Sequence, residues 1–101
     1  MSHEPPRIGE LFPELTGELV DLLHAEGEND LAASVPFLRL TQWCECQDSF
    51  CKSFYTAPPP QGKYGPHHRC VALLPDSGMI ILDVVLGEIQ YVEILDRPSL
   101  S

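Results

Sequence analysis

Three short apolar runs in the C-terminal third of the chain constrain the fold most. They span residues 69–74, 79–86 and 89–95 and are rich in valine, isoleucine and leucine, a composition typical of β-strands. Pro75-Asp76-Ser77-Gly78 joins the first two runs as a turn, and Gly87-Glu88 joins the last two. Parallel strands need a crossover of about a dozen residues, so connections this short predict an antiparallel meander.

The N-terminal third has a helical period and predicts an acidic amphipathic helix over residues 12–25. Pro13 suits its first turn, where the missing N–H is no loss, and Gly27 suits its end. A second, shorter helix is expected over residues 29–35, ending before Pro36. The helical spacing is carried by Leu15, Leu19, Leu22 and Leu23, with Glu14, Glu18 and Asp21 between them.

Between these regions the period changes to two, which predicts a β-hairpin. Along the first strand, which begins at Phe37, we expect Trp43 to face outward, partly covered by a loop or by a partner. Residues 51–56 are the returning strand. Residues 57–66 hold four prolines and two glycines and are expected to form an exposed loop. The side chains expected to face the core are those of Leu38, Leu40, Cys44 and Cys46.

Together these patterns predict an α+β fold. An N-terminal acidic helix would pack on an antiparallel sheet of about five strands, formed by the hairpin and the C-terminal meander. With 101 residues, 44% of them hydrophobic, the chain can bury one core. We therefore expect a single domain over residues 1–101, with a flexible N-terminus over residues 1–9.

The N-terminus lacks the features of a secretory signal, and no apolar run approaches the length of a membrane span. A cytoplasmic protein is therefore expected, in a compartment where thiols stay reduced.

The formal charge of the chain is −9, from 15 acidic and 6 basic residues. Residues 1–35 contribute most of it, because they hold eight acids against Arg7 alone. Such a charge repels the phosphates of nucleic acids and the surface of anionic membranes, so we expect neither as a partner. A basic protein is the complementary partner.

The four cysteines form a C-x-C-x4-C-x18-C pattern. Thiolates are preferred zinc ligands, so one hypothesis is a structural zinc ion held by all four. The first two are separated by a single residue, however, and on a regular strand such side chains start about 6.5 to 7 Å apart. The strand would have to bend for both sulfurs to reach one ion. The ligands in this hypothesis are Cys44, Cys46, Cys51 and Cys70.

Two other interpretations of the cysteines stay open. Cys46 and Cys51 would face each other across the hairpin, near enough for a disulfide after modest adjustment. In a reducing compartment such a bond points to redox sensing. Reduced cysteines are also ordinary core residues, and Cys44 and Cys46 continue an apolar face while Cys70 opens a strand.

The sequence contains no recognised motif for nucleophilic catalysis, metalloprotease activity or phosphate binding, so we expect a non-enzyme. His67 and His68 are adjacent and would point to opposite faces of a strand, so they can hardly share one metal ion. A solvated loop end is the expectation for both. Asp83 and Glu93 are expected on the solvent face of their strands.

The cysteine pattern followed by the meander resembles small uncharacterised bacterial domains. These pair a leading acidic helix with a cysteine-bearing hairpin and a C-terminal meander, and the resemblance covers roughly residues 31–98. It carries no named function. Some small acidic α+β proteins of similar build are immunity partners of secreted toxins, an analogy that implies protein binding. The residues that carry the resemblance are Cys44-x-Cys46-x4-Cys51-x2-Phe54, Ile80-x-Leu82-Asp83-Val84 and Gly87-Glu88-Ile89-x2-Val92-Glu93-Ile94-Leu95.

These observations favour a non-enzymatic module for protein–protein interaction that needs no cofactor. The alternative is a small zinc protein that uses the four cysteines, and a thiol redox protein is the third hypothesis. The residues expected to contact a partner are Trp43, Tyr64, Glu14, Glu18 and Asp21.

Overall fold

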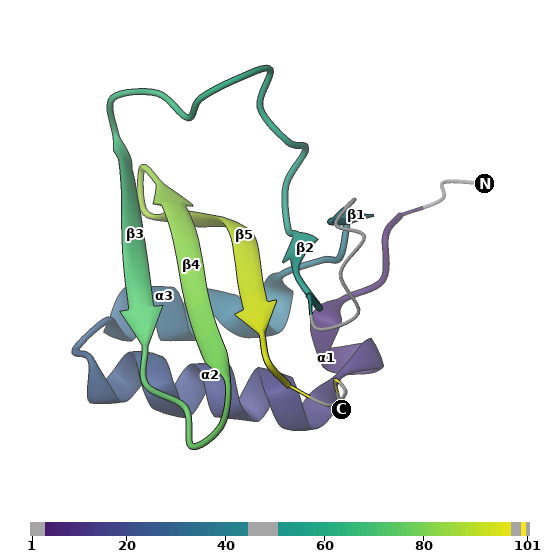
Figure 1. Ribbon diagram of the computed structural model, residues 1–101, viewed down its shortest axis with the longest axis vertical. Helices are drawn as coiled ribbons and strands as arrows, with labels where there is room; N and C mark the ends of the chain where they lie inside the picture. The colour runs from purple at the N-terminus through teal and green to yellow at the C-terminus, as the bar shows by residue number, and fades with distance from the viewer. Residues whose placement is uncertain (1–3, 45–50, 98–99, 101) are drawn as a thin grey trace.

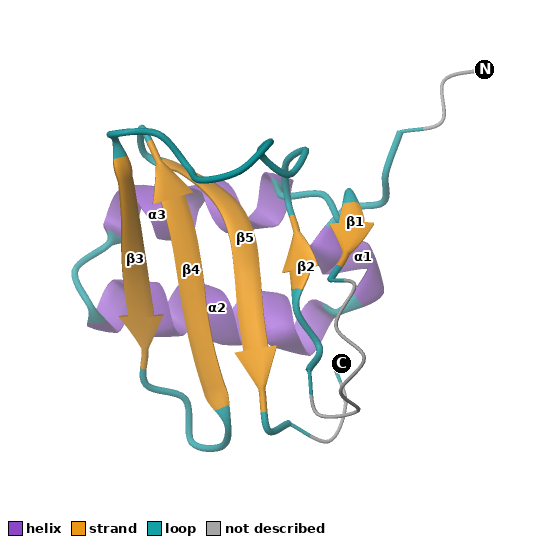
Figure 2. Cartoon of the chain, turned by 45° about the horizontal axis from the view of Figure 1, so that its top comes forward, coloured by secondary structure: helices purple, strands orange, loops and turns teal. Residues whose placement is uncertain are grey.

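The computed structural model of the chain describes residues 4–44, 51–97 and 100. It confirms the α+β class, with short helices on one face of a five-stranded antiparallel sheet (Figures 1 and 2). The helical elements are α1 (Ile8–Leu11), α2 (Pro13–Ala25), α3 (Asn29–Ser34) and a 3-10 turn, η1 (Val35–Phe37). The strands are β1 (Gln42–Trp43), β2 (Phe54–Tyr55), β3 (His68–Leu73), β4 (Met79–Val85) and β5 (Glu88–Leu95).

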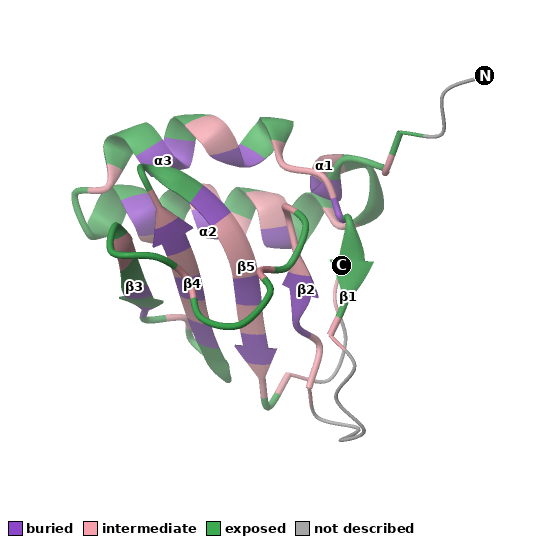
Figure 3. Cartoon of the chain, turned by 90° about the horizontal axis from the view of Figure 1, so that it is seen from above, coloured by how far each residue is buried: buried purple, intermediate pink, exposed green. Residues whose placement is uncertain are grey.

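The order of the strands in the sheet is β1-β2-β5-β4-β3, and every neighbouring pair is antiparallel. The predicted meander is therefore confirmed as β3-β4-β5. The hairpin β1-β2 adds to the free edge of β5, so the chain must cross from β2 to β3 at the opposite edge. The proline-rich segment 56–67 makes this crossing, and it passes on the side of the sheet away from the helices (Figures 1 and 3).

The core lies between the helices and the inner face of the sheet, which is the face turned toward the helices. Alternate residues of β4 are fully buried there, and Figure 3 shows this alternation along the strands. The leucines that define the amphipathic pattern of α2 pack on the same core. The buried side chains that meet in this layer include Leu15, Leu19, Leu23, Ile80, Leu82, Val84, Val92 and Ile94.

A β-bulge in β5 sets which residues face outward. Asp83 pairs with Tyr91, but the next residue of β4, Val84, pairs with Ile89, so Gln90 is the extra residue. In a regular strand residues 89 and 91 would share a face. Because of the bulge, Ile89 is buried while Tyr91 lies opposite Asp83 on the outer face.

Within the segment expected to be flexible, residues 1–9, the structure describes residues 4–9, and part of these contacts the core. Ile8 is completely buried, and its N–H donates to the carbonyl of Leu38. The N–H of Leu40 in turn donates to the carbonyl of Pro6. The buried side chain of Ile8 and these two backbone hydrogen bonds together attach this segment to the core.

The first strand of the hairpin is much shorter than predicted, and this reverses one expectation. Trp43 pairs with the buried Phe54, so both lie on the inner side, and edge-to-face contacts join Trp43 to Phe54 and to Phe12. The expected outward position of Trp43 is thus wrong, although its place at the sheet edge leaves it 48% exposed. The period-two count starting at Leu38 fails because η1 and irregular backbone precede the strand.

Candidate functional site

A row of polar side chains crosses the outer face of the sheet. Backbone pairing places Cys70 of β3 opposite Asp83 of β4, Asp83 opposite Tyr91 of β5, and Tyr91 opposite Tyr55 of β2. Each of them follows or precedes a buried residue of its own strand, so all four share the face away from the helices. The sheet thus presents a thiol, a carboxylate and two phenols in line.

At the β3 end of this row, His68 joins Cys70 and Asp83. The Nε2 atom of His68 lies 2.7 Å from Oδ1 of Asp83, and the thiol of Cys70 donates to the same oxygen over 3.3 Å. The sulfur of Cys70 is 3.8 Å from Nε2 of His68. A nitrogen, a sulfur and an oxygen atom therefore lie close together, and all three potential ligand atoms are within 4.8 Å of one another.

Tyr64 of the proline-rich segment closes one side of this group. Its ring stacks on that of His68, with centroids 4.8 Å apart and planes inclined by 30°. The hydroxyl of Tyr64 is buried without a hydrogen-bond partner among the described residues. Burial, followed by the nearby charge of Asp83, raises the pKa of Tyr64 to about 12. The phenol therefore stays protonated at neutral pH.

The thiol of Cys70 is held in its protonated form. The hydrogen bond to Asp83 is the main cause that raises the pKa of Cys70, and partial desolvation acts in the same direction. Reactive redox cysteines have a lowered thiol pKa instead. The surroundings of Cys70 therefore do not support the hypothesis of a redox-active thiol at this position.

The structure separates the cysteines of the predicted zinc site. Cys51 bridges to Leu95 of β5, next to Met79 of β4, whereas Cys70 lies on β3 opposite Asp83. Strands β5 and β4 therefore lie between Cys51 and Cys70. Cys44 takes part in a disulfide, and Cys46 lies outside the described residues, so the four-cysteine site stays a prediction.

Sequence reasoning missed His68 and Asp83 as partners of Cys70. The signal was the pattern His68-x-Cys70, because residues two apart on a strand share a face. The contribution of Asp83 depends on strand register, which brings it directly opposite Cys70. Two short cysteine side chains at this spacing start too far apart to share an ion, whereas the longer imidazole of His68 reaches to within 3.8 Å of the sulfur of Cys70.

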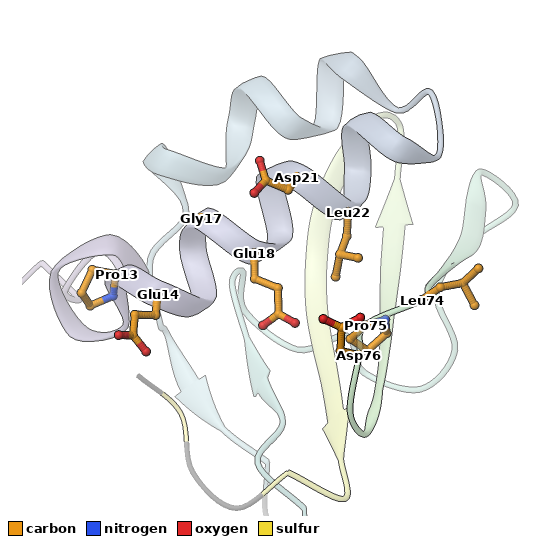
Figure 4. A pocket seen from close by; sticks show the side chains of 9 residues that line it. All are labelled: Pro13, Glu14, Gly17, Glu18, Asp21, Leu22, Leu74, Pro75 and Asp76. Carbon is orange, nitrogen blue, oxygen red and sulfur yellow. The ribbon is translucent and has the colours of Figure 1, made fainter.

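A second candidate site is an acidic groove of about 600 Å³ between α2 and the turn that joins β3 to β4 (Figure 4). Three of its carboxylates, those of Glu14, Asp21 and Asp76, are exposed and form no ion pair with any described residue. Glu18 also lines the groove, but the guanidinium of Arg97 donates to both of its oxygens, at 3.0 and 2.7 Å. This bidentate contact raises the pKa of Arg97.

The groove also has an apolar side. Leu22 and Pro75 line it, and Leu74 stands 79% exposed at its rim, pointing outward (Figure 4). An apolar side chain this exposed next to unneutralised carboxylates is suited to bind a segment that is both basic and apolar.

The predicted contact residues fall into separate groups. Glu14, Glu18 and Asp21 come together along the acidic groove. Trp43 lies at the β1 edge of the sheet, and Tyr64 lies on the outer face beside His68.

Comparison with known proteins identified no relative of this chain. The chain matches no protein-family model, no curated protein and no solved structure at a significant level. Within the described residues, the longest helix is too short and too polar to cross a membrane.

Proposed function

We propose that the protein is a non-enzymatic interaction module that binds a basic segment of a partner protein in the acidic groove. The single observation that supports this most is the group of three exposed carboxylates, Glu14, Asp21 and Asp76, beside the exposed Leu74. They come from two elements, α2 and the β3–β4 turn, so the groove is a composite surface held in place by the core.

The charge of the groove supports a basic partner. Glu18 is neutralised by Arg97, and the other three carboxylates of the groove have no cation beside them among the described residues. Lysine and arginine side chains of a partner would meet these carboxylates with their charged ends and cover Leu22 and Leu74 with their aliphatic stems. An apolar residue of the partner next to Leu74 would supply the non-electrostatic part of the affinity.

Charges at such an exposed site raise the rate of association more than they raise the affinity. Each exposed ion pair contributes about 0.2 to 1 kcal/mol, and salt weakens it. Steering by a chain with a net charge of −9 would still accelerate the approach of a basic partner at low salt.

The test compares two triple variants that carry the same net charge. One removes the groove carboxylates, Glu14→Gln with Asp21→Asn and Asp76→Asn. The other removes exposed carboxylates elsewhere, Glu26→Gln with Asp30→Asn and Glu88→Gln. The probe is a synthetic peptide of lysines and leucines, with a glutamate–leucine peptide as the control, and calorimetric titration gives the affinities.

We expect the groove variant to bind the basic peptide about tenfold more weakly, since three exposed pairs at roughly 0.5 kcal/mol each sum to about 1.5 kcal/mol. The control variant should stay within about twofold of the wild type. Equal weakening of both variants would mean that the peptide responds to net charge alone, and the groove would then not be a binding site.

A further inference from the structure

We propose that His68, Cys70 and Asp83 form a binding site for a divalent transition-metal ion of the zinc class. The ligands would be Nε2 of the histidine, the thiolate of the cysteine and a carboxylate oxygen of the aspartate. The site lies on the outer face of β3 and β4, and none of its residues lines the acidic groove. The inference is therefore independent of the proposed function.

The separations of the ligand atoms already approach those of a tetrahedral zinc site. Bond lengths of about 2.0 to 2.3 Å place neighbouring ligand atoms about 3.3 to 3.7 Å apart. The sulfur of Cys70 is 3.3 Å from Oδ1 of Asp83 and 3.8 Å from Nε2 of His68. Only the contact between His68 and Asp83, at 2.7 Å, must widen, by roughly 0.6 Å, for an ion to enter.

The backbone holds these residues in place before any ion binds. His68 and Cys70 are two apart on β3 and share a face, and Cys70 pairs directly with Asp83 in a regular ladder. The stacked ring of Tyr64 further restricts the orientation of the imidazole of His68. Ligands on paired strands, oriented by a neighbouring ring, need little reorganisation to bind a metal.

The donor atoms select the kind of ion. A thiolate and an imidazole favour zinc, cobalt or copper over calcium and magnesium, which prefer oxygen ligands. Cys70 would bind as a thiolate, and its proton would pass to the solvent. Three protein ligands leave a fourth position for water or for another molecule. The side chains of His68 and Asp83 are 29% and 22% exposed, so an ion can reach the site from solvent.

Titration with Co²⁺ tests this site, because thiolate–cobalt coordination produces a charge-transfer absorption band that exposed carboxylates do not give. The chain supplies two matched pairs of variants. Cys70→Ser is compared with Cys51→Ser, since both residues are free cysteines. His68→Gln is compared with His67→Gln, the neighbouring residue outside the group. Mg²⁺ serves as the control ion, and thermal unfolding of each variant checks that it folds.

We expect one cobalt ion per chain, displaced by Zn²⁺ but not by Mg²⁺. The band should disappear in Cys70→Ser and persist in Cys51→Ser, and His68→Gln should weaken binding at least tenfold while His67→Gln leaves it unchanged. A band that persists in Cys70→Ser, or that needs Cys51, would overturn this site, and the latter result would favour the four-cysteine site. The absence of any band in the wild type would also overturn it. The triple groove variant should keep the band, so failure of the metal site and failure of the docking groove can be told apart.

Discussion

The two faces of the β3-β4-β5 meander differ in composition although they alternate along the same strands. On the inner face of β4, Ile80, Leu82 and Val84 are all fully buried against the helices. On the outer face of the same strand, Ile81 and Asp83 are only half-buried. The inner face is purely aliphatic in this strand, whereas the outer face places a carboxylate beside a thiol and an imidazole.

The inner face of the sheet therefore contributes most of the stability, whereas the outer face carries the polar side chains of the candidate site. Burial of aliphatic side chains contributes about 25 cal/mol per Å² of apolar surface, and that stabilisation belongs to the face that the helices cover. The outer face is free of this packing requirement, so polar groups can occupy it without destabilising the core. Substitutions on the two faces should therefore have distinct effects.

The largest expected effect comes from truncating one residue on each face of β4. Leu82→Ala should lower the free energy of unfolding by about 3 to 4 kcal/mol, because it leaves a cavity in the hydrophobic core. Ile81→Ala, at the neighbouring half-buried position, should lower it by only about 1 kcal/mol. Urea denaturation followed by circular dichroism measures both values. Equal losses would mean that the outer face is packed as tightly as the core, and the contrast between the faces would fail.

On the outer face, we expect a substitution that changes the reactivity of Cys70 without a large change in the free energy of unfolding. Asp83→Asn removes the charged acceptor that raises the pKa of Cys70, so the pKa should fall toward its ordinary value and more thiolate should be present near neutral pH. In the presence of a chelator, alkylation of native Cys70 should accelerate several-fold, measured by mass spectrometry over time.

Cys51 provides the internal control, because it pairs with Leu95 on the side of β5 away from β4 and Asp83, and its labelling rate in this variant should not change. The free energy of unfolding should change by less than about 1 kcal/mol. Slower labelling of Cys70, or equal acceleration of both cysteines, would contradict the assignment of the raised pKa to Asp83.

The smallest effect is expected at the turn between β4 and β5, which belongs to neither face. Leu86 has a φ of 52° there and Gly87 a φ of 78°, as in a type I′ turn. Asparagine tolerates this left-handed conformation better than leucine, so Leu86→Asn should raise the free energy of unfolding by roughly 0.5 kcal/mol.

Leu74→Asn is the matched control, since Leu74 is 79% exposed, close to the 72% of Leu86, but has no positive φ. Differential scanning calorimetry should show a higher melting temperature for Leu86→Asn only. A similar gain in both variants would indicate that removal of exposed leucine, rather than relief at the turn, is the cause.

Several features of the fold followed from local patterns. The meander depends on turns too short for a crossover, and α2 depends on leucines at helical spacing with Pro13 in its first turn. Both signals lie within a few residues of the structure they specify. The length of the hairpin strands was not predictable in the same way, because η1 replaces the start of the expected first strand and breaks the alternation.

The candidate sites depended on tertiary structure to different degrees. Glu14, Glu18 and Asp21 were recognisable as one acidic group, because helical spacing alone brings them close together. Their neighbours Leu74 and Asp76 are more than 50 residues away along the chain and join the groove only through packing of α2 beside the β3–β4 turn. The group formed by His68, Cys70 and Asp83, in contrast, could be recognised only from the register of β3 and β4.

The sequence by itself determined the elements whose signals are local: an acidic amphipathic helix, the turns of the meander and the net charge of −9. Tertiary structure alone decided that β2 pairs with β5, that Ile8 belongs to the core, and that Asp83 lies opposite Cys70. The physical reason is that hydrophobic burial constrains only which face of a strand turns inward. Which outward-facing residues meet depends on strand order, register and a bulge, and these are settled by the packing of the whole chain.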